Sequence, residues 1–286
     1  MGLMEPNGTL YLTNDRKTKM YPTQDNSLGL FPGPPHVGGT CPFATGHKGG
    51  CFHVPEGRQQ PPCYAYCNCQ IYKTAAEHLR ENTKLVRDAC RWKAMAKLLS
   101  EAVGRFREKT LKYAKLKKFD KKQTKELLRF RIHWAGDFFS MAYTRAWACT
   151  IRMFPDVTFW AYTRSFKYLE PLHALPNLVL YLSLDNANWE KGMSEFFKYG
   201  FDRDFGKTRK VAYMSCEERD LQLMLAKMAE RPERYCRTDP ARVLEWTAST
   251  RISRCPVDLG KMKLEYGCKT CKQCLTPGNQ FLFFKC

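Results

Sequence analysis

The hydrophobic pattern divides the chain into a helical segment and a segment of alternating strands and helices. From residue 71 to about residue 126, apolar residues recur at the spacing of one helix face, with charged residues between them. From residue 129 onward, short runs rich in aromatic and branched apolar residues alternate with helical stretches. This change of period predicts helices first and an α/β core after them.

Four strands are predicted in the second segment, each leading into a helical stretch or a polar turn. They span residues 130–135, 157–162, 178–184 and 210–214, and helices are expected over 141–154 and 217–229, with a short helical stretch up to residue 175. Strand–helix units repeated every 20 to 30 residues or so are typical of a parallel sheet with right-handed crossovers. The predicted fold class is therefore α/β.

Polar residues follow each predicted strand, where parallel α/β folds place their chemistry. They are Asp137, Thr163-Arg164-Ser165, Asp185-Asn186 and Ser215-Cys216. We predict that Asp137, Arg164 and Asp185 orient a substrate or cofactor as catalytic residues. For Asp185-Asn186, capping of the helix that follows before Trp189 is an alternative role.

Cysteines gather at both ends of this core. Of the 14 cysteines, ten fall in two short windows and are predicted to be metal ligands: Cys41, Cys51, Cys63, Cys67 and Cys69 in the first, and Cys255, Cys268, Cys271, Cys274 and Cys286 in the second. Clustered cysteines in a reducing compartment more often hold metal than form disulfides. Cys90 and Cys149 lie in helical patterns and are expected to be buried free thiols.

The second window contains a CxxCxxC run at residues 268–274, with Cys255 and Cys286 as candidate fourth ligands. Ferredoxin-type 4Fe–4S sites use such a run with a remote fourth cysteine. Zinc, which usually takes two cysteine pairs in a closed tetrahedral site, is the alternative.

The first window lies in a stretch dense in Gly and Pro, which lets the backbone wrap closely around a bound group. It ends in a CxxxCxC run at residues 63–69, which is expected to lead into a helix near Ile71. A second metal site is predicted here. His47 and His53 are either zinc ligands or ordinary solvated side chains.

Charge adds a candidate partner. Lys and Arg number 47 against 28 Asp and Glu, a formal net charge of +19. Residues 105–131 alone carry twelve basic side chains against three acidic ones. We predict that this segment contacts nucleic acid, with DNA as the expected form, through phosphate neutralisation; a solvated helix face is the alternative. The predicted contact residues are Lys112, Lys115, Lys117, Lys118, Lys121 and Lys122.

No apolar run is long enough to cross a membrane, and the first residues lack the apolar stretch of a secretory signal. We therefore expect a cytoplasmic protein without a membrane partner. Its segments are residues 1–70, cysteine-rich; 71–128, basic and helical; 129–254, the α/β core; and 255–286, the second cysteine window. We expect them to form one compact domain.

Five segments together carry a family resemblance: CPFATG with Cys51 and CYA (Cys41 to Ala65), RIHWAGDFFS (131–140), FWAYTRSF (159–166), LYLSLDNAN (180–188) and the closing CxxCxxC. The chain resembles phage-encoded proteins of the mycobacteriophage gene-88-product type, which are themselves similar to radical S-adenosylmethionine enzymes. The resemblance covers about two thirds of the chain and leaves residues 73–125 mostly outside.

The resemblance implies a partial or full (β/α) barrel with iron–sulfur clusters, two of them if both cysteine windows are used. It places Cys41, Cys51 and Cys63 at the family's three-cysteine positions. It also implies a cofactor contact at Gly136, Asp137 and Ser183, as in the motif that binds S-adenosylmethionine. The chain has CxxxCxC in place of the usual CxxxCxxC, and a fourth thiolate from Cys67 or Cys69 would close the cluster to that cofactor.

The function expected from this resemblance is an iron–sulfur enzyme acting on a nucleic-acid base. Some hypermodified phage thymidines require an iron–sulfur enzyme for a rearrangement, and an isomerase of this kind is the specific reaction we expect. A non-catalytic nucleic-acid-binding protein stabilised by zinc is the alternative. A thiol oxidoreductase is a third alternative, but CxxCxxC has one thiol more than that chemistry needs.

Overall fold

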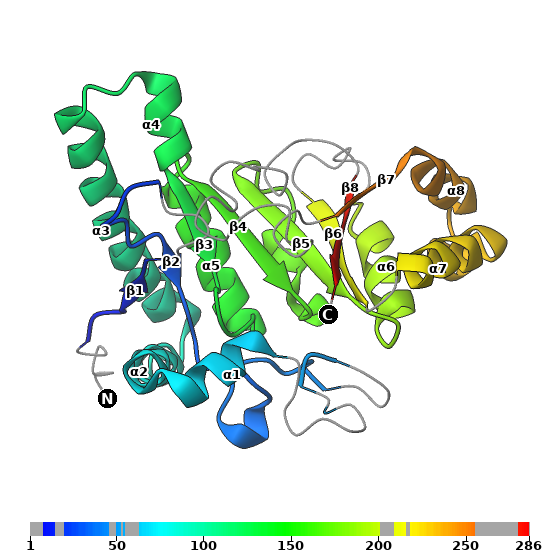
Figure 1. Cartoon of the computed structure of the whole chain (residues 1–286), viewed down its shortest axis with the longest axis horizontal. Coiled ribbons are helices and arrows are strands. Elements are labelled where there is room, and N and C mark those ends of the chain that lie inside the picture. Colours follow the sequence, from blue (N-terminus) through cyan, green and yellow to red (C-terminus); the bar gives the residue numbers. More distant parts are fainter. Residues whose placement is uncertain are drawn as a thin grey trace.

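The computed structural model describes residues 8–14, 20–45, 50–52, 54, 63–200, 209–215, 218–254 and 280–285. At its centre lies an eight-stranded sheet with the order β1-β2-β3-β4-β5-β6-β8-β7 (Figure 1). All neighbouring strands are parallel except β1 and β2. The strands are β1 (Leu12–Thr13), β2 (Ser27–Leu28), β3 (Arg129–Ile132), β4 (Thr158–Thr163), β5 (Leu178–Leu184), β6 (Arg209–Ser215), β7 (Arg251–Arg254) and β8 (Gln280–Lys285).

Eight α-helices are found in the described part of the chain. They are α1 (Tyr64–Ile71), α2 (Lys73–Asp88), α3 (Trp92–Leu116), α4 (Lys121–Leu127), α5 (Met141–Met153), α6 (Trp189–Lys198), α7 (Glu218–Glu230) and α8 (Pro240–Ser249). Short 3-10 turns at Phe166–Tyr168 and Glu170–Leu172 connect β4 to β5, and another lies at Pro232–Arg234. In that part of the chain, no helix is both long and apolar enough to cross a membrane.

The main core lies between the sheet and helices α3, α5 and α6. Alternate residues of β3, such as Phe130 and Ile132, are fully buried and meet the aromatic side chains of α5, including Trp147. Six of the seven residues of β5 are buried, as expected for a central parallel strand covered on both faces. This packing fixes the positions of the strand ends, on which the candidate site depends.

The α/β class and the parallel sheet are confirmed. The four predicted strands and the helices that follow them are present, with most ends within one or two residues of the prediction. Strand β3 ends earlier than predicted, at Ile132, because His133 adopts a left-handed backbone with φ 61°. Among the described strands no pairing joins β1 to β7, so the sheet is open and closure into a full barrel stays a prediction.

The predicted start of the first helix is wrong. Helix α1 begins at Tyr64 rather than near Ile71, so Cys67 and Cys69 lie on a helix and Cys63 is its N-cap residue. The expectation that Cys90 is buried is also wrong, because this thiol is exposed. Cys149 is half-buried.

The two edges of the sheet carry different elements. Because β3 to β6 run parallel, their carboxyl ends share one edge, and α1 lies there, at the bottom of Figure 1. Helix α4 ends directly before β3 begins, so the turn between α3 and α4 lies at the opposite, amino edge, at the top of Figure 1. A site built on the strand ends is therefore separated from this turn by the length of the sheet.

Candidate functional site

Asp137 connects the ends of β3 and β4. Its Oδ1 accepts hydrogen bonds from the Thr163 hydroxyl at 2.6 Å and from the Phe138 N–H at 2.7 Å, and its Oδ2 accepts one from the Arg164 N–H at 2.9 Å. Burial raises the pKa of this carboxyl, while the hydrogen bonds oppose that shift. Because several donors from two strand ends meet on it, Asp137 holds Arg164 in place.

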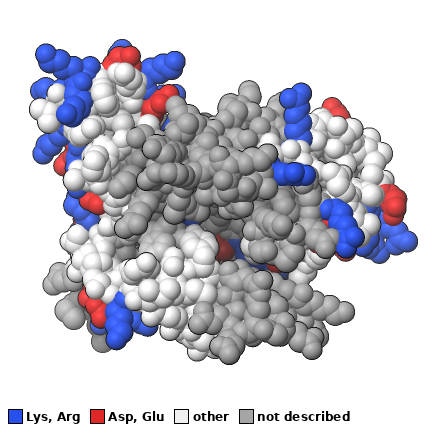
Figure 2. Space-filling view, in the orientation of Figure 1, with Lys and Arg blue, Asp and Glu red and all other residues white. Residues whose placement is uncertain are grey.

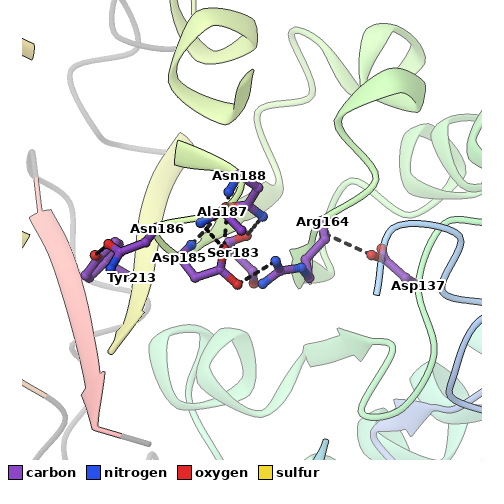
Figure 3. Close-up of polar contacts among 8 residues, drawn as sticks. All are labelled: Asp137, Arg164, Ser183, Asp185, Asn186, Ala187, Asn188 and Tyr213. Carbon is purple, nitrogen blue, oxygen red and sulfur yellow. Dashed lines mark hydrogen bonds and ion pairs between the residues drawn. The ribbon is translucent and has the colours of Figure 1, made fainter. Parts of the chain in front are cut away.

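Arg164 reaches from the end of β4 to the end of β5 (Figure 3). Its guanidinium donates to Asp185 Oδ2 at 2.7 Å, in an ion pair whose side chains are only 10% and 14% exposed. The Nε of Arg164 is buried and has no hydrogen-bond partner among the described atoms. A buried guanidinium with an unused donor is suited to binding an anionic group.

Asp185 also organises its own loop. Its Oδ1 accepts from the N–H groups of Ala187 and Asn188, at 2.9 and 3.2 Å. The Asn188 side-chain oxygen accepts a hydrogen bond from the Asp185 N–H at 2.8 Å, and its amide nitrogen donates to the Ser183 carbonyl at 3.1 Å. The alternative of helix capping is wrong, because the N-cap residue of α6 is Asn188. Asp185 instead closes a turn before α6, which leaves its Oδ2 for Arg164.

At the next strand the network continues through Asn186, whose side chain accepts a hydrogen bond from the Tyr213 hydroxyl of β6. Side chains from the ends of β3, β4 and β5 and from within β6 therefore lie in one row, which Figure 3 shows. The sequence predicted Asp137, Arg164 and Asp185 at this edge, and the structure brings them together. Tyr213 was not predicted, because it lies within a strand rather than after one.

Gly136 brings the end of β3 against the segment that carries Cys41. Its φ is +85°, and a Cβ at this position would lie 2.6 Å from Thr40 Oγ1 and 3.0 Å from the Leu30 carbonyl. Leu30 in turn donates its N–H to the Ala135 carbonyl at 2.9 Å. This close approach explains why glycine precedes Asp137, and it is independent of the cofactor contact predicted for the same residue.

Three cysteines of the first window, Cys41, Cys51 and Cys63, lie together beside this row. The Cys51 and Cys63 thiols are hydrogen-bonded to each other, and Cys41 interacts electrostatically with both. Burial, and after it the charge of Asp137, raises the pKa of Cys41. The contact with Cys63 and burial raise the pKa of Cys51, with a smaller contribution from Asp137 that the nearby Arg164 opposes. We call Cys41, Cys51 and Cys63 the cysteine triad.

The hydrogen bond between Cys51 and Cys63 shifts the pKa values of the two thiols in opposite directions. The pKa of Cys63 is lowered, first by the Cys51 thiol that donates to it and then by the backbone N–H groups of Ala65 and Tyr66 in the first turn of α1. The pKa of Cys51 is raised by the same contact and by burial. A lowered pKa at a helix N-terminus favours the thiolate, which is the form of cysteine that ligates metals.

The other two cysteines of the first window differ from the triad. Cys69 is buried in an apolar cluster with Phe31, Ala76 and Leu79, and only burial and Arg80 influence its pKa. Cys67 lies one helical turn after Cys63.

Within the described ranges, no group of three His, Cys, Asp or Glu side chains has the arrangement that would hold a metal ion. Of the other predicted ligands, Cys255, Cys268, Cys271, Cys274, Cys286, His47 and His53 lie outside the described residues.

The predicted nucleic-acid contacts lie at the amino edge of the sheet. All six lysines are exposed around the turn between α3 and α4, and Figure 2 shows basic side chains gathered there. Since α3 has 25 residues, this turn lies about 37 Å along its axis from its first residue, Trp92. The lysines therefore do not border the cysteine triad.

Comparison with known proteins identifies relatives of the chain. The profile described as "Gene product 88" matches residues 9–276. The chain belongs to the Gene product 88 family. Among its relatives, the Gene 88 protein of Mycobacterium phage D29 is 41% identical over 165 residues, and that of Mycobacterium phage L5 is 39% identical over the same length.

Each alignment with these Gene product 88 relatives covers 57% of the chain and 58% of the relative. Both relatives are bacteriophage proteins, which supports a phage origin. No solved structure matches the chain.

Proposed function

We propose that the chain is an iron–sulfur enzyme that acts on a base of nucleic acid. The observation that carries the proposal is the position of the cysteine triad. Three thiols from a loop region and a helix N-terminus lie beside Asp137 and Arg164, at the carboxyl edge of a parallel sheet. This is the edge at which parallel α/β enzymes place their reactive groups.

The chemistry of the triad suits a cationic centre. All three thiols are half-buried, and Cys41 and Cys51 lie near the buried carboxyl group of Asp137. The negatively charged forms of the three thiols repel one another. A bound cation would offset this repulsion and displace the proton between Cys51 and Cys63. An iron–sulfur cluster distributes its cysteine ligands over several iron atoms, so the thiols need not converge on one point as they must around zinc. Cys67 is the described candidate for a fourth ligand.

When bound, such a cluster would supply electron transfer or a Lewis-acidic iron. The protein supplies the surroundings. Asp137 fixes the backbone of Arg164, and Asp185 fixes its guanidinium through one nitrogen. The remaining buried donor, Nε, is positioned to bind a carboxylate or phosphate of the substrate or of a second cofactor such as S-adenosylmethionine.

The nucleic-acid substrate is supported by the formal charge of +19 and by the exposed lysines of the α3–α4 turn. An enzyme that acts on a base must bring that base out of the stack and into the active site. Basic residues outside the site can hold the phosphate backbone of the same strand during this step. The specific reaction we propose is a rearrangement during thymidine hypermodification in phage DNA. It rests on analogy with the iron–sulfur step of that pathway and on the phage relatives.

Anaerobic purification with iron, sulfide and zinc quantification tests the proposal. We expect a brown protein with about four irons and four sulfides for each cluster. Replacing Cys41, Cys51 or Cys63 by Ala should each remove about four irons, whereas Cys90→Ala, at an exposed thiol outside the triad, should remove none. A colourless protein that holds zinc at the triad would refute the enzyme and favour a zinc-stabilised binding protein.

A further inference from the structure

Two adjoining cavities form a groove along α6. The larger has a volume of about 770 Å³ and the smaller about 510 Å³, and they share Ser194 and Arg234. The smaller is lined by Asn186 and Lys191 near the start of α6, and the larger by Lys198 at its end. We call these two cavities together the α6 groove.

The charge of the α6 groove is strongly positive. The thirteen residues that line the larger cavity include four Lys or Arg and no Asp or Glu: Lys198, Arg234, Arg237 and Arg242. The smaller adds Lys191, opposed by Glu190 alone. Hydroxyl groups from Ser194 and Thr238 also face this space, so the lining offers hydrogen-bond donors as well as positive charge.

Two of these arginines are available to a ligand. Arg237 is exposed and has no ion-pair partner among the described residues. Arg234 lies 3.8 Å from Glu190 in an exposed pair, a contact too weak to withhold it from a phosphate. Arg242, in contrast, is held in position, because its guanidinium donates to the Phe197 carbonyl at 2.9 Å and lies over the Phe197 ring.

The α6 groove starts at the candidate site. Asn186, which lines its smaller cavity, follows Asp185 directly and is hydrogen-bonded to Tyr213 in the row of strand ends. The ten residues of α6 span about 15 Å, which suits the backbone of a few nucleotides. The lysines of the α3–α4 turn, at the amino edge beyond α4, have no such continuity with the site.

We propose that the α6 groove binds the sugar–phosphate backbone of the nucleic-acid strand whose base enters the site at the carboxyl edge. The inference rests on the proposed function for the identity of the substrate. The groove itself defines the path of the strand. Phosphates lie against Lys191, Arg234 and Arg237, and Tyr199 at the end of α6 offers a ring on which a base can stack.

Fluorescence anisotropy with a labelled single-stranded DNA twelve-mer tests this path on the full chain. The variant Arg234→Ala/Arg237→Ala should bind at least about tenfold more weakly than the unaltered chain. Because this variant neutralises two fewer phosphates, its slope of log affinity against log salt should be shallower by about 1.4. The control Arg145→Ala/Arg152→Ala removes the same charge from two exposed positions on α5 and should leave binding unchanged.

The outcomes separate this inference from the proposed function. If the unaltered chain binds the DNA and both double variants bind equally well, the groove is not the path, and the proposed function stands. If the unaltered chain binds no nucleic acid, the proposed substrate itself is wrong. If ATP binds the unaltered chain and only this binding is lost in Arg234→Ala/Arg237→Ala, the groove holds a free nucleotide and the strand path is overturned.

Discussion

The Arg164 guanidinium lies 2.7 Å from the Asp185 carboxylate, and this ion pair joins the ends of two adjacent parallel strands. Both side chains are mostly buried, at 10% and 14% exposed. The same arginine is held through its backbone by Asp137. A single residue therefore sets the spacing of three strand ends beside the cysteine triad.

Breaking this pair should destabilise the fold measurably. We expect Asp185→Asn to lower the free energy of unfolding by about 2 kcal/mol, because the Arg164 charge stays in a largely buried position without its partner. In a double-mutant cycle with Arg164→Met, denaturant unfolding should give a coupling energy of about 1 to 2 kcal/mol. The exposed pair Arg107–Asp156 serves as the control and should couple by less than about 1 kcal/mol. Equal coupling in the two pairs would contradict a buried role for Arg164.

Gly136→Ala tests the close approach between β3 and the Cys41 segment. The substitution adds backbone strain at φ +85° and a contact of 2.6 Å with Thr40, so we expect a loss of roughly 3 kcal/mol in unfolding free energy. Gly38→Ala is a matched control, because Gly38 has φ +79° but nothing within 4 Å of the added methyl group. It should cost only about 1 kcal/mol. Similar losses in both variants would mean that backbone strain alone explains Gly136.

His133 should make the fold sensitive to acid. Burial lowers its folded pKa to about 3, while the unfolded chain titrates near 6.5. Below pH 6.5 the unfolded state therefore binds a proton that the folded state does not. The free energy of unfolding should fall as the pH is lowered from 6.5 toward 3, by up to about 1.4 kcal/mol per pH unit.

Urea unfolding between pH 5 and 7 measures this effect. The variant His133→Asn keeps a residue type that tolerates the left-handed backbone at φ 61° and should show a flatter pH dependence than the unaltered chain. Identical slopes would show that His133 takes up a proton in the folded state as readily as in the unfolded chain, which contradicts the lowered pKa.

The lysines of the α3–α4 turn should contribute a salt-dependent part of DNA binding. We expect Lys117→Gln/Lys121→Gln/Lys122→Gln to weaken binding to a duplex and to reduce the slope of log affinity against log salt by up to about 3. The corresponding triple substitution to Arg keeps the charge and should preserve both. If the Gln variant matches the unaltered chain, these lysines form a solvated face.

The core could be predicted because its signals are local. Phe159 and Leu180 belong to apolar runs whose length and composition indicate buried strands, and Asp137 and Asp185 follow such runs directly. Strands β1 and β2 could not be predicted, since two residues carry no period. Strand β8 is not predicted, because its apolar run lies inside the second cysteine window, whose spacing indicates metal ligands instead of a strand.

The cysteines show the limit of spacing as a guide. Cys63 and Cys69 stand six residues apart in one dense window, and the sequence assigns both to a metal site. The fold separates them, because helix α1 turns Cys69 into an apolar cluster while its first turn presents backbone N–H groups to Cys63. The start of helix α1 at Tyr64, which the spacing of the cysteines does not give, separates the proposed ligand Cys63 from Cys69, which packs in the apolar cluster.

The iron and sulfide content of Cys63→Ala and Cys69→Ala, both purified anaerobically, tests the central claim most directly. With both variants folded by circular dichroism, Cys63→Ala should lose about four irons and four sulfides relative to the unaltered chain, and Cys69→Ala should lose none. Equal iron in Cys63→Ala and the unaltered chain would contradict a cluster at the cysteine triad.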